Sequence, residues 1–468
     1  MTMEKELPEG WDLEELGALC SKIGSGSTPK GGQNAYVPVG VPLIRSMNIH
    51  FDLFKEDGLA FINDEAASKL NGVEVFRGDV LLNITGASIG RVNIVPEKYI
   101  GARVNQHVAI VRAFTGVKSR YIWYFLRTPA LQNIIKETES GATRQALTKD
   151  KISSFKIPLP PLAEQQVIAD KLDALLAQVE TTKTRLERVP ETIKRFRQSV
   201  LAAAVSGRLT EEWREEATTQ QWETVKLEAV SDIKDPHPSH RTPKVVEGGV
   251  PYIGIGDLLE NGEIDFANAR KVDRSVLEEH NSRYQLQNGD FVFGKIGTLG
   301  KVTVLPIGID YTLSANVILI QPIKSKVIPK YLMMFLSAPG TMAEVAKQAN
   351  STSQAAFGIK KMRALVTDIP PLPEQQEIVR RVEELFAHAD AVEQQAKAAL
   401  EKVNNLTQSI LAKAFRGELT ADWRAANPEL ISGENSAEAL LARIKEERAA
   451  QKPKKRATTR RKKKVVSD

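Results

Sequence analysis

Two long segments of this chain carry large apolar residues at alternating steps of four and three. Such a seven-residue repeat predicts two long helices that pack along one seam, and two such helices in one chain can pair with each other. At ~1.5 Å per residue, about forty residues make a rod of roughly 60 Å, and antiparallel pairing would put the attached domains at opposite ends. Two core helices of a larger α domain are the alternative. The predicted seam residues are Ile168, Leu172, Leu175, Val179, Leu186, Ile193, Phe196, Val200, Ile378, Val382, Leu385, Val392, Val403, Leu406 and Ile410.

The two helical segments begin and end with repeated motifs. Pro-Pro-Leu-Ala-Glu-Gln-Gln at 160–166 returns as Pro-Pro-Leu-Pro-Glu-Gln-Gln at 370–376, at an offset of 210 residues (370 − 160). Gly-Arg-Leu-Thr-Glu-Glu-Trp-Arg at 207–214 returns at the same offset as Gly-Glu-Leu-Thr-Ala-Asp-Trp-Arg at 417–424. Pro190 interrupts the first segment, where it removes a helix hydrogen bond and should bend the rod, whereas Leu400 stands at that place in the second.

The segment before the first helix is typical of a mixed α/β domain. After Trp11 we expect a short helix over residues 12–22, followed by a polar glycine-rich loop at 24–34. Short β runs bounded by Gly, Asn, Asp and Pro predict strands, and an aromatic patch at 121–126 predicts a helix. The predicted strands are 41–44, 80–84, 92–95 and 108–111.

Residues 222–369 repeat the first domain. Trp222 corresponds to Trp11, and Val-Pro-Tyr-Ile at 250–253 corresponds to Val-Pro-Leu-Ile at 41–44. We therefore predict an α+β fold in which two homologous mixed α/β domains alternate with two long antiparallel coiled-coil helices as a pseudo-twofold internal repeat. The predicted segments are a domain at 1–155, a helix at 156–214, a domain at 215–369, a helix at 370–424, a helical segment at 425–450 and a basic disordered tail at 451–468.

The net charge of +6 is unevenly distributed. Nine of the 64 basic residues lie at 452–464, so the remaining chain has 55 basic residues against 58 acidic residues, a charge of −3. A protein that binds DNA tightly without partner subunits would be expected to carry a surface rich in Lys and Arg. Either the basic groups of the body cluster locally, or other subunits supply contacts to phosphates. The tail is either a solvated charge run or a nonspecific attractor of nucleic acid.

Cysteine usage and hydropathy indicate a cellular compartment. The single cysteine, Cys20, excludes a disulfide framework, suits a reducing cytoplasm and is expected to be an inert small hydrophobe. No apolar run approaches the ~18 residues that span a bilayer, and the first residues do not resemble a signal peptide. We expect a soluble cytoplasmic protein.

Catalytic and cofactor motifs are incomplete in this sequence. The glycine-rich loop lacks the Gly-Lys-[Ser/Thr] ending of a P-loop, and no Asn/Asp-Pro-Pro-aromatic run of an amino-methyltransferase is present. His237 and His240 lack nearby cysteines, so we predict no metal site. Gly78-Asp79 and Gly289-Asp290 precede predicted strands and are interpreted as turns, with nuclease carboxylates as the alternative. We expect no catalytic residues.

Two domains that alternate with two long helices, each introduced by Pro-Pro-Leu-x-Glu-Gln, resemble the specificity subunit (HsdS) of type I restriction-modification systems. Arg-Phe-Arg-Gln at 195–198 and Asn-Asn-Leu-Thr-Gln-Ser-Ile-Leu-Ala-Lys-Ala-Phe-Arg-Gly-Glu-Leu-Thr at 404–420 are similar to the IA subclass. The resemblance implies that each domain is a target recognition domain for one half of an asymmetric, bipartite double-stranded DNA site, and that the helices fix the gap.

The resemblance also implies partners. Two modification subunits would dock on the helices and carry S-adenosylmethionine to methylate adenine, and restriction subunits would cleave DNA with ATP and magnesium. We expect no cofactor in this chain and a bacterial or archaeal source.

Base reading needs hydrogen-bonding side chains on loops of a rigid scaffold, and the polar clusters of both domains fit that requirement. A plain turn or solvated loop is the alternative at each position. The candidates of the first domain are Ser27, Thr28, Lys30, Arg45, Asn48, Asn83, Thr85, Ser88, Arg91, Arg103, Asn105, Gln106, Thr143, Arg144 and Gln145. The candidates of the second domain are Arg241, Thr242, Lys244, Lys295, Thr298, Lys301, Ser351, Thr352, Ser353 and Gln354.

Two other functions compete with this hypothesis. A self-contained DNA-binding regulator could use its internal pseudo-dyad as a dimeric repressor does, although the near-neutral body argues against tight binding without partners. An enzyme, such as a nuclease, is supported by no complete catalytic constellation.

Overall fold

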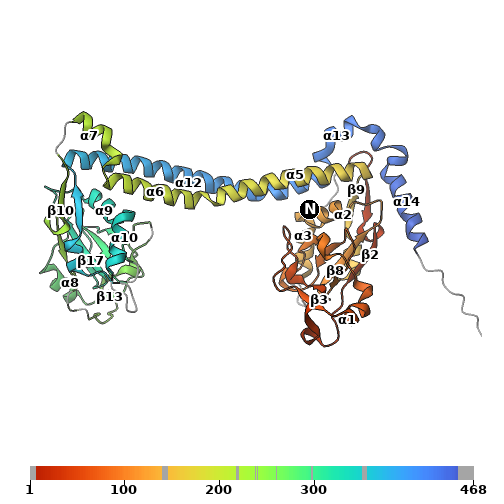
Figure 1. Cartoon of the computed structure of the whole chain (residues 1–468), viewed down its shortest axis with the longest axis horizontal. Helices are drawn as coiled ribbons and strands as arrows, with labels where there is room; N and C mark the ends of the chain where they lie inside the picture. Colours follow the sequence, from red (N-terminus) through yellow and green to blue (C-terminus); the bar gives the residue numbers. More distant parts are fainter. Residues whose placement is uncertain are drawn as a thin grey trace, which may run out of the picture. The chain divides into compact units, whose positions relative to one another are not determined.

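The computed structural model describes residues 7–139, 146–217, 221–237, 239, 241–259, 261–296, 299–349 and 356–451 (Figure 1). The chain forms two compact units. Unit 1 consists of Met1–Arg185 and Ala399–Asp468, and unit 2 consists of Leu186–Ala398. Each unit therefore contains one globular domain together with parts of both long helical segments.

Three sheets build the globular domain of unit 1. A four-stranded antiparallel sheet has the order β2-β8-β5-β6, a three-stranded sheet has the order β4-β3-β7, and β1 pairs with β9. In the three-stranded sheet, β3 pairs antiparallel with β4 and parallel with β7. The strands are β1 Asp12–Glu15, β2 Cys20–Ser25, β3 Tyr36–Ile44, β4 Ala60–Ile62, β5 Val80–Asn83, β6 Val92–Ile94, β7 Arg103–Val104, β8 Val108–Ala113 and β9 Lys156–Leu159.

Both faces of the four-stranded sheet are buried. Val80 and Leu82 of β5 pack in one core, against helices, whereas Leu81 between them packs in a second core beneath the three-stranded sheet. Successive strand residues point to opposite faces, so a continuous apolar run can supply two cores at once. The four predicted strands at 41–44, 80–84, 92–95 and 108–111 are confirmed, the last three within two residues at each end, whereas the first begins five residues earlier, at Tyr36 of β3.

The predicted helix at 12–22 is wrong. Residues 12–15 form β1, which pairs antiparallel with β9, and residues 20–25 form β2. A short 3-10 turn, Leu16–Ala18, lies between these strands and buries Leu16. The apolar spacing suggested a helix, but strand pairing with a segment about 145 residues further along the chain supplies the backbone hydrogen bonds instead.

Short helices complete unit 1. The predicted helix at 121–126 is confirmed as α2, which buries Tyr121, Ile122 and Phe125 in the main core. The predicted C-terminal helix is confirmed as α14, whose Leu440, Leu441 and Ile444 join the same core. These helices are α1 Asp64–Lys69, α2 Ser119–Leu126, α3 Pro129–Glu139, α4 Lys149–Ser153, α13 Ala421–Ala426 and α14 Ala437–Ala450.

Unit 2 repeats the domain of unit 1 sheet by sheet. Its sheets have the orders β11-β17-β14-β15, β13-β12-β16 and β10-β18, and the four-stranded sheet again has a core on each face. Its strands are β10 Glu223–Lys226, β11 Ser231–Lys234, β12 Val250–Ile253, β13 Lys271–Val272, β14 Phe291–Gly294, β15 Val302–Val304, β16 Thr312–Leu313, β17 Val317–Pro322 and β18 Val366–Ile369. Its short helices are α7 Glu211–Ala217, α8 Arg274–Asn281, α9 Pro329–Ser337, α10 Pro339–Gln348 and α11 Ile359–Ala364.

The long helices are α5 Leu162–Glu187, α6 Val189–Val205 and α12 Leu372–Phe415. α5 and α6 are separated at Arg188, with Pro190 in the first turn of α6, so the predicted interruption is confirmed. α12 has no proline at the corresponding position and continues for 44 residues. A proline in the first turn of a helix is tolerated because its missing N–H has no intrahelical partner there.

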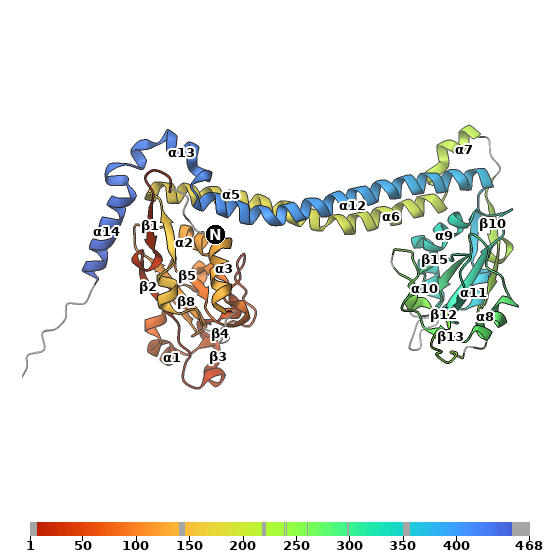
Figure 2. The same ribbon diagram turned by 180° about the vertical axis from the view of Figure 1, so that it is seen from behind.

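The helices pair in antiparallel fashion within each unit (Figures 1 and 2). In unit 1, Lys171 Nζ near the start of α5 donates to the carbonyl of Leu419, just after the end of α12, at 3.1 Å. In unit 2, Arg197 of α6 pairs with Asp390 of α12 at 2.5 Å, and Arg381 donates to the carbonyl of Leu209 at 2.8 Å. As the residue number rises along one helical segment, the number of the residue that it contacts on the other segment falls. The two segments therefore run antiparallel.

Burial along the predicted seam is uneven. Ile168 and Leu172 join the main core of unit 1, and Val200, Ile378 and Val382 join that of unit 2. Val403 is also buried. The seam residues Leu175, Val179, Leu186, Ile193, Leu385, Val392 and Ile410 are half-buried. The ends of the helices are therefore parts of the domain cores.

Two seam predictions are wrong. Phe196 is 36% exposed and Leu406 is 45% exposed, and these residues occupy the same place in the repeat (406 − 196 = 210). An α-helix drifts ~20° per heptad from a strict seven-residue repeat, so four heptads after Ile378, along the unbroken α12, the stripe at Leu406 has turned by about 80°, while Phe196 lies in α6, beyond the break at Arg188. Only two helices pair, so residues that turn away from the seam face solvent.

A buried glutamate anchors the helices to each domain. In unit 1, Glu164 of α5 accepts hydrogen bonds from Trp11 Nε1 at 2.8 Å, Thr420 Oγ1 at 2.6 Å and Arg424 at 2.6 Å. In unit 2, Glu374 of α12 accepts from Trp222 Nε1 at 2.9 Å, Thr210 Oγ1 at 2.8 Å and Arg214 Nε at 2.9 Å. We call these two networks the glutamate clasps.

Each clasp joins three parts of the chain. The tryptophan begins the globular domain, the glutamate begins one long helix, and the threonine and arginine follow the end of the other. The opening motif of the first copy thus meets the closing motif of the second copy in unit 1, and the reverse pairing occurs in unit 2.

Candidate nucleic-acid interface

Four polar loops of unit 1 meet at one end of its sheets. The amide of Ser27 donates to the carbonyl of Val104 at 3.0 Å, and that of Ile84 donates to the carbonyl of His107 at 3.0 Å. Asn105 N donates to the carbonyl of Ile44 at 3.0 Å. The loops at 26–30, 45–48, 84–91 and 105–107 therefore form one surface, which we call the unit 1 loop surface.

Part of the predicted set is available on this surface. Ser27, Lys30 and Gln106 are exposed. The half-buried members are Thr28, Arg45, Thr85, Ser88 and Arg91. Thr85 Oγ1 bonds to His107 Nδ1 at 2.6 Å, and Arg45 lies over the ring of Tyr36 with its guanidinium carbon 5.6 Å from the ring centroid. These side chains belong to the same loop surface.

Other members of the predicted set are buried and hold the loops in place. Asn48 accepts from the amide of Arg45 and donates to the carbonyl of Lys55, each at 2.9 Å. Asn83 donates to the carbonyl of Ser46 at 2.8 Å, and Asn105 accepts from the amide of His107 at 3.1 Å. Arg103 is buried against carbonyls of its own domain, including that of Ala67 at 3.2 Å.

The corresponding loops of unit 2 form the unit 2 loop surface, at 241–244, 254–257, 295–296, 299–301 and 314–316. The amide of Ser314 donates to the carbonyl of Ile253 at 2.8 Å, and the amide of Lys295 donates to that of Asn316 at 2.9 Å. Arg241, Thr242 and Lys244 are exposed.

Two of the three predicted lysines of this surface have partners within the domain. Lys295 pairs with Asp235 at 3.2 Å, and Lys301 donates to the carbonyl of Leu258. Eight predicted residues lie outside the described part of the chain: Thr143, Arg144, Gln145, Thr298, Ser351, Thr352, Ser353 and Gln354.

A buried histidine pair supports the unit 2 loop surface. His237 Nε2 lies 2.7 Å from the carbonyl of Arg241, which can only accept, so this nitrogen donates. His237 Nδ1 then accepts from His280 Nε2 at 2.9 Å, and His280 Nδ1 accepts from the hydroxyl of Thr312. Burial, with His237 nearby, lowers the pKa of His280 to about 4, which keeps its ring neutral.

In the sequence, His237 stands out only as part of an incomplete metal-binding pattern, and no pattern points to its partner 43 residues away. Within the described ranges, no group of three or more His, Cys, Asp or Glu side chains is placed to hold a metal ion. Cys20 is buried, and burial raises the pKa of its thiol.

The predicted turns before β5 and β14 are confirmed. Gly78 has φ +81° and Gly289 has φ +92°, values that favour glycine. The following carboxylates have partners: Asp79 pairs with Arg112 at 2.7 Å, and Asp290 accepts from the amide of Gln287 at 2.8 Å. Burial raises the pKa of Asp290.

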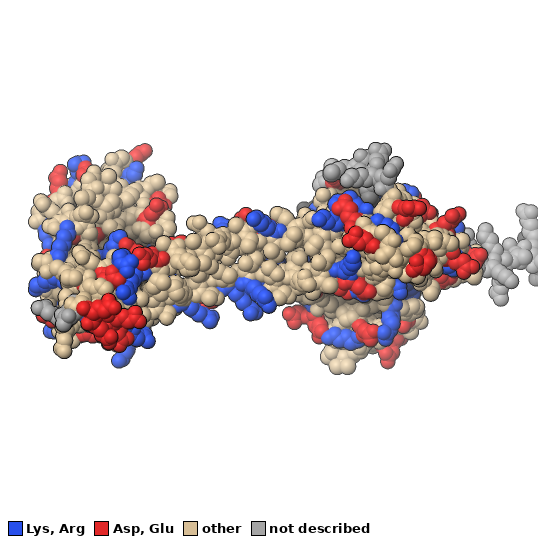
Figure 3. All heavy atoms as spheres, turned by 90° about the horizontal axis from the view of Figure 1, so that it is seen from above, with Lys and Arg blue, Asp and Glu red and all other residues tan. Residues whose placement is uncertain are grey.

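Basic and acidic side chains lie side by side on the surface of both units. Basic and acidic side chains are interspersed over the face of each unit that Figure 3 shows. This agrees with a body whose charges nearly cancel outside the C-terminal tail. No helix in the part of the chain that the structure describes is long and apolar enough to cross a membrane.

Two comparisons with solved structures agree with this fold. The crystal structure of the HsdS subunit from Thermoanaerobacter tengcongensis superposes with a TM-score of 0.62 at 19% identity, covering 89% of this chain and 99% of that one. A chain from a structural study of complex assembly and conformational transition of the type I restriction-modification system gives a TM-score of 0.61 at 20% identity, covering 88% of this chain and all of that one.

Sequence comparisons are more specific. The specificity subunit of the type I restriction enzyme EcoKI from Escherichia coli K12 is 36% identical over 469 residues, covering 95% of this chain and 97% of the relative. That of EcoDI from Escherichia coli is 39% identical over 486 residues with the same coverage. The family model for the type I restriction modification DNA specificity domain matches twice, at residues 8–191 and 219–402. The chain belongs to the family of type I restriction-modification specificity subunits.

Proposed function

We propose that this chain is the noncatalytic specificity subunit of a type I restriction-modification complex and that each unit reads one half of a bipartite, asymmetric DNA site. One observation carries the proposal: both units gather polar loops at the same end of the same sheets, but with different side chains. Arg45 in unit 1 corresponds to Gly254 in unit 2, and His107 corresponds to Asn316. A shared scaffold with different loop residues supports the reading of different bases.

The proposed contacts are the accessible members of the two loop surfaces. Asn48, Asn83, Arg103 and Asn105 are assigned the role of holding loops, because they are buried and bonded within the domain. The contacts are Ser27, Thr28, Lys30, Arg45, Thr85, Ser88, Arg91 and Gln106 in unit 1 and Arg241, Thr242 and Lys244 in unit 2.

The long helices set the distance between the half-sites and dock two modification subunits in this proposal. Phe196 and Leu406 support docking, because each is a large exposed apolar residue at the same place of the repeat. A single exposed apolar residue is common on protein surfaces, so the support lies in its recurrence at the same place in both copies of the repeat. Two equivalent positions in one chain suit two copies of the same partner.

The chemistry is assigned to the partner subunits. Modification subunits would carry S-adenosylmethionine and methylate adenine, and restriction subunits would use ATP and magnesium to cleave. Asp79 and Asp290, which had a nuclease alternative, are bonded inside the domains. The complex would act on DNA in the cytoplasm of a bacterium or an archaeon.

Reconstitution of the chain with its modification subunits tests the proposal. We expect adenine methylation at one bipartite motif in genomic DNA, detected by long-read sequencing, and no motif when this gene is deleted. Methylation at a continuous motif, or at none, would contradict the assignment.

A regulator that acts alone is the second candidate, because the internal repeat gives one chain the symmetry of a dimer. Binding of the isolated chain to the motif separates the two functions. With a nearly neutral body, we expect a Kd weaker than about 1 µM at physiological salt without partners. Nanomolar binding by the isolated chain would favour the regulator.

A further inference from the structure

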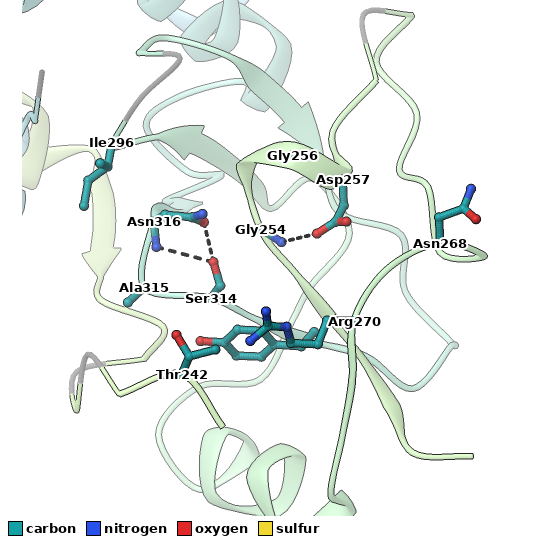
Figure 4. Close-up of a pocket in the computed structure, with 11 residues that line it drawn as sticks. Thr242, Gly254, Gly256, Asp257, Asn268, Arg270, Ile296, Ser314, Ala315 and Asn316 are labelled. Atoms are coloured by element: carbon teal, nitrogen blue, oxygen red, sulfur yellow. Dashed lines mark hydrogen bonds between the residues drawn. The ribbon is translucent and has the colours of Figure 1, made fainter. Parts of the chain in front are cut away.

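Unit 2 contains a cavity of about 600 Å³ on its loop surface. Side chains from five separate loops line it, among them Thr242, Asp257, Arg270, Ile296 and Asn316, with the backbone of Gly254 on one wall (Figure 4). The cavity lies at the end of β12, where the polar loops of unit 2 meet. Arg270, Asp257, Ser314 and Asn316 were not among the predicted contacts.

The cavity exists because residue 254 is glycine. Gly254 and Arg45 occupy the same position: the amide of Gly254 is capped by Asp257 Oδ2 at 2.7 Å, as the amide of Arg45 is capped by Asn48 Oδ1 at 2.9 Å. A Cβ atom on residue 254 would lie 3.0 Å from Ser314 Oγ and 3.1 Å from Asn316. A larger side chain there would enter the cavity, whereas in unit 1 the arginine is already present.

Arg270 presents hydrogen-bond donors at this cavity. The side chain is exposed, and its guanidinium forms no ion pair or hydrogen bond with another residue in the described part of the chain. The carbonyl of Arg270 accepts from the amide of Tyr252 at 2.7 Å, which fixes the backbone beneath the side chain. An arginine whose backbone is held in place and whose guanidinium has no partner is suited to donating two parallel hydrogen bonds to one ligand.

Asn316 presents a donor to the same space. Its Oδ1 accepts from the amide of Ile255 at 3.1 Å and from the hydroxyl of Ser314, so the orientation of the amide is determined. The Nδ2 group has no hydrogen-bond partner among the residues described in this structure. Asp257 uses one carboxylate oxygen to cap Gly254, and the other oxygen remains an acceptor.

From this donor and acceptor pattern we infer that the cavity reads a guanine–cytosine pair in the half-site of unit 2. Arg270, assisted by Asn316 Nδ2, donates to O6 and N7 of guanine, the acceptors that guanine presents in the major groove. Asp257 accepts from the N4 amino group of cytosine, the donor of that pair. The inference rests on the proposed function and adds a base identity to it.

The histidine pair fixes the opposite wall. His237 donates to the carbonyl of Arg241, and the next residue, Thr242, lines the cavity. His280 is held by Thr312 of β16, so the loop is bonded to the sheet through two imidazole rings. A reading site built on such a support is preorganised, which favours discrimination between base pairs.

Arg270→Gln in the complex with the modification subunits tests the inference. Lys271→Gln is the matched control, because it removes the same charge from the neighbouring exposed residue. The readouts are the genomic methylated motif and binding to oligonucleotides in which each base pair of the motif is replaced in turn. We expect Arg270→Gln to lower discrimination at one G·C pair by about 10- to 100-fold, with the other half-site unchanged.

Gly254→Arg is the second variant, because it places a large side chain in the cavity while residue 270 remains arginine. We expect Gly254→Arg to change base-pair discrimination in the same half-site in which Arg270→Gln lowers it. An unchanged motif in Arg270→Gln overturns the inference, as does a uniform loss of affinity at all positions, which would identify a phosphate contact. If the unmodified complex methylates no bipartite motif, the proposed function fails first, and this inference fails with it.

Discussion

Glu164 and Glu374 are completely buried, which is an expensive position for a carboxylate. Three donors meet each of them: an indole N–H, a hydroxyl and a guanidinium. A buried carboxylate that accepts three hydrogen bonds ties its donors together strongly. Loss of the carboxylate would leave the indole, the hydroxyl and the guanidinium without their acceptor. The clasps therefore explain why Trp, Thr and Arg recur with the glutamate in both copies of the repeat.

We predict that Glu374→Gln lowers the free energy of unfolding of unit 2 by about 2 kcal/mol, because a neutral amide replaces the charged acceptor of Arg214 and Trp222. Urea denaturation followed by tryptophan fluorescence measures the change. The matched control is Glu383→Gln, whose ion pair with Lys330 is largely exposed and should contribute less than about 1 kcal/mol. Equal effects in the two variants would contradict the role of the clasp.

His280 makes the stability of unit 2 depend on pH. Burial, followed by His237, lowers its pKa to about 4; Arg283 acts in the same direction, Glu279 acts against it, and the ring of Tyr284 lies 6.0 Å away. The unfolded chain then binds a proton at pH 6.5 to 4 more readily than the folded unit does. Stability is therefore complete above pH 6.5 and falls as the pH drops through this window, by about 3 kcal/mol.

The measurement for this prediction is the urea midpoint at several pH values. His280→Gln should remove most of the slope between pH 6.5 and 4, whatever its effect on absolute stability. His388→Gln, at an exposed position of α12, should leave the slope unchanged. A slope that survives in His280→Gln would assign the pH dependence to other groups.

At the scale of elements, each long helix serves two purposes along its length. The ends are parts of domain cores, as Ile168 and Leu172 are in unit 1 and Ile378 and Val382 are in unit 2. The intervening turns are only half-buried, and Phe196 and Leu406 face solvent. A helix pair of this kind leaves apolar surface for a further partner.

We predict that Phe196→Ser combined with Leu406→Ser lowers the free energy of unfolding by about 1 kcal/mol for each residue, because more than half of each side chain is covered. Affinity for the modification subunits should fall at least about 10-fold, because a lost interface anchor costs 1 kcal/mol or more. Gln198→Ser with Gln408→Ser is the control, since these exposed residues also differ by the offset of the repeat. Sedimentation of the mixed subunits reports assembly, and undiminished assembly would exclude docking at these positions.

At the scale of the whole molecule, the long helices determine the number of base pairs between the two half-sites in the proposed function. One heptad adds about 10 Å of helix, the length of about 3 base pairs of DNA. We predict that one heptad inserted beside Val179 of α5, together with one beside Val403 of α12, lengthens the spacer of the methylated motif by about 2 to 3 base pairs. Both residues lie in the paired segment of unit 1, where they line one cavity.

The bases of both half-sites should stay the same in this variant. Long-read sequencing of methylated DNA gives the half-sites and the spacer together. An unchanged spacer with altered half-sites would show that the helices act on recognition instead. A single insertion in α5 alone is the control, and it should disturb assembly because the facing helix keeps its original length.

Much of the candidate site could be predicted at the level of loops but not of single residues. Loops of unit 1 with Ser27, Arg45, Thr85 and Gln106 do meet on one surface, because they follow strands of the same sheets. Arg103 had the same polar character in the sequence and is buried. Arg270 and Asn316 had no distinguishing pattern, since their value as donors depends on the space that Gly254 leaves.

The sequence by itself determined the duplication, the alternation of domains and helices, the interruption at Pro190 and most strands, because these features follow from periodicity and local backbone preference. Only the tertiary structure decided that residues 12–15 pair as a strand with β9, that Phe196 and Leu406 face solvent, and that Glu164 meets Thr420 while Glu374 meets Thr210. Those outcomes depend on contacts between segments far apart in the chain. Such contacts are set by the packing of the whole unit, which no local pattern contains.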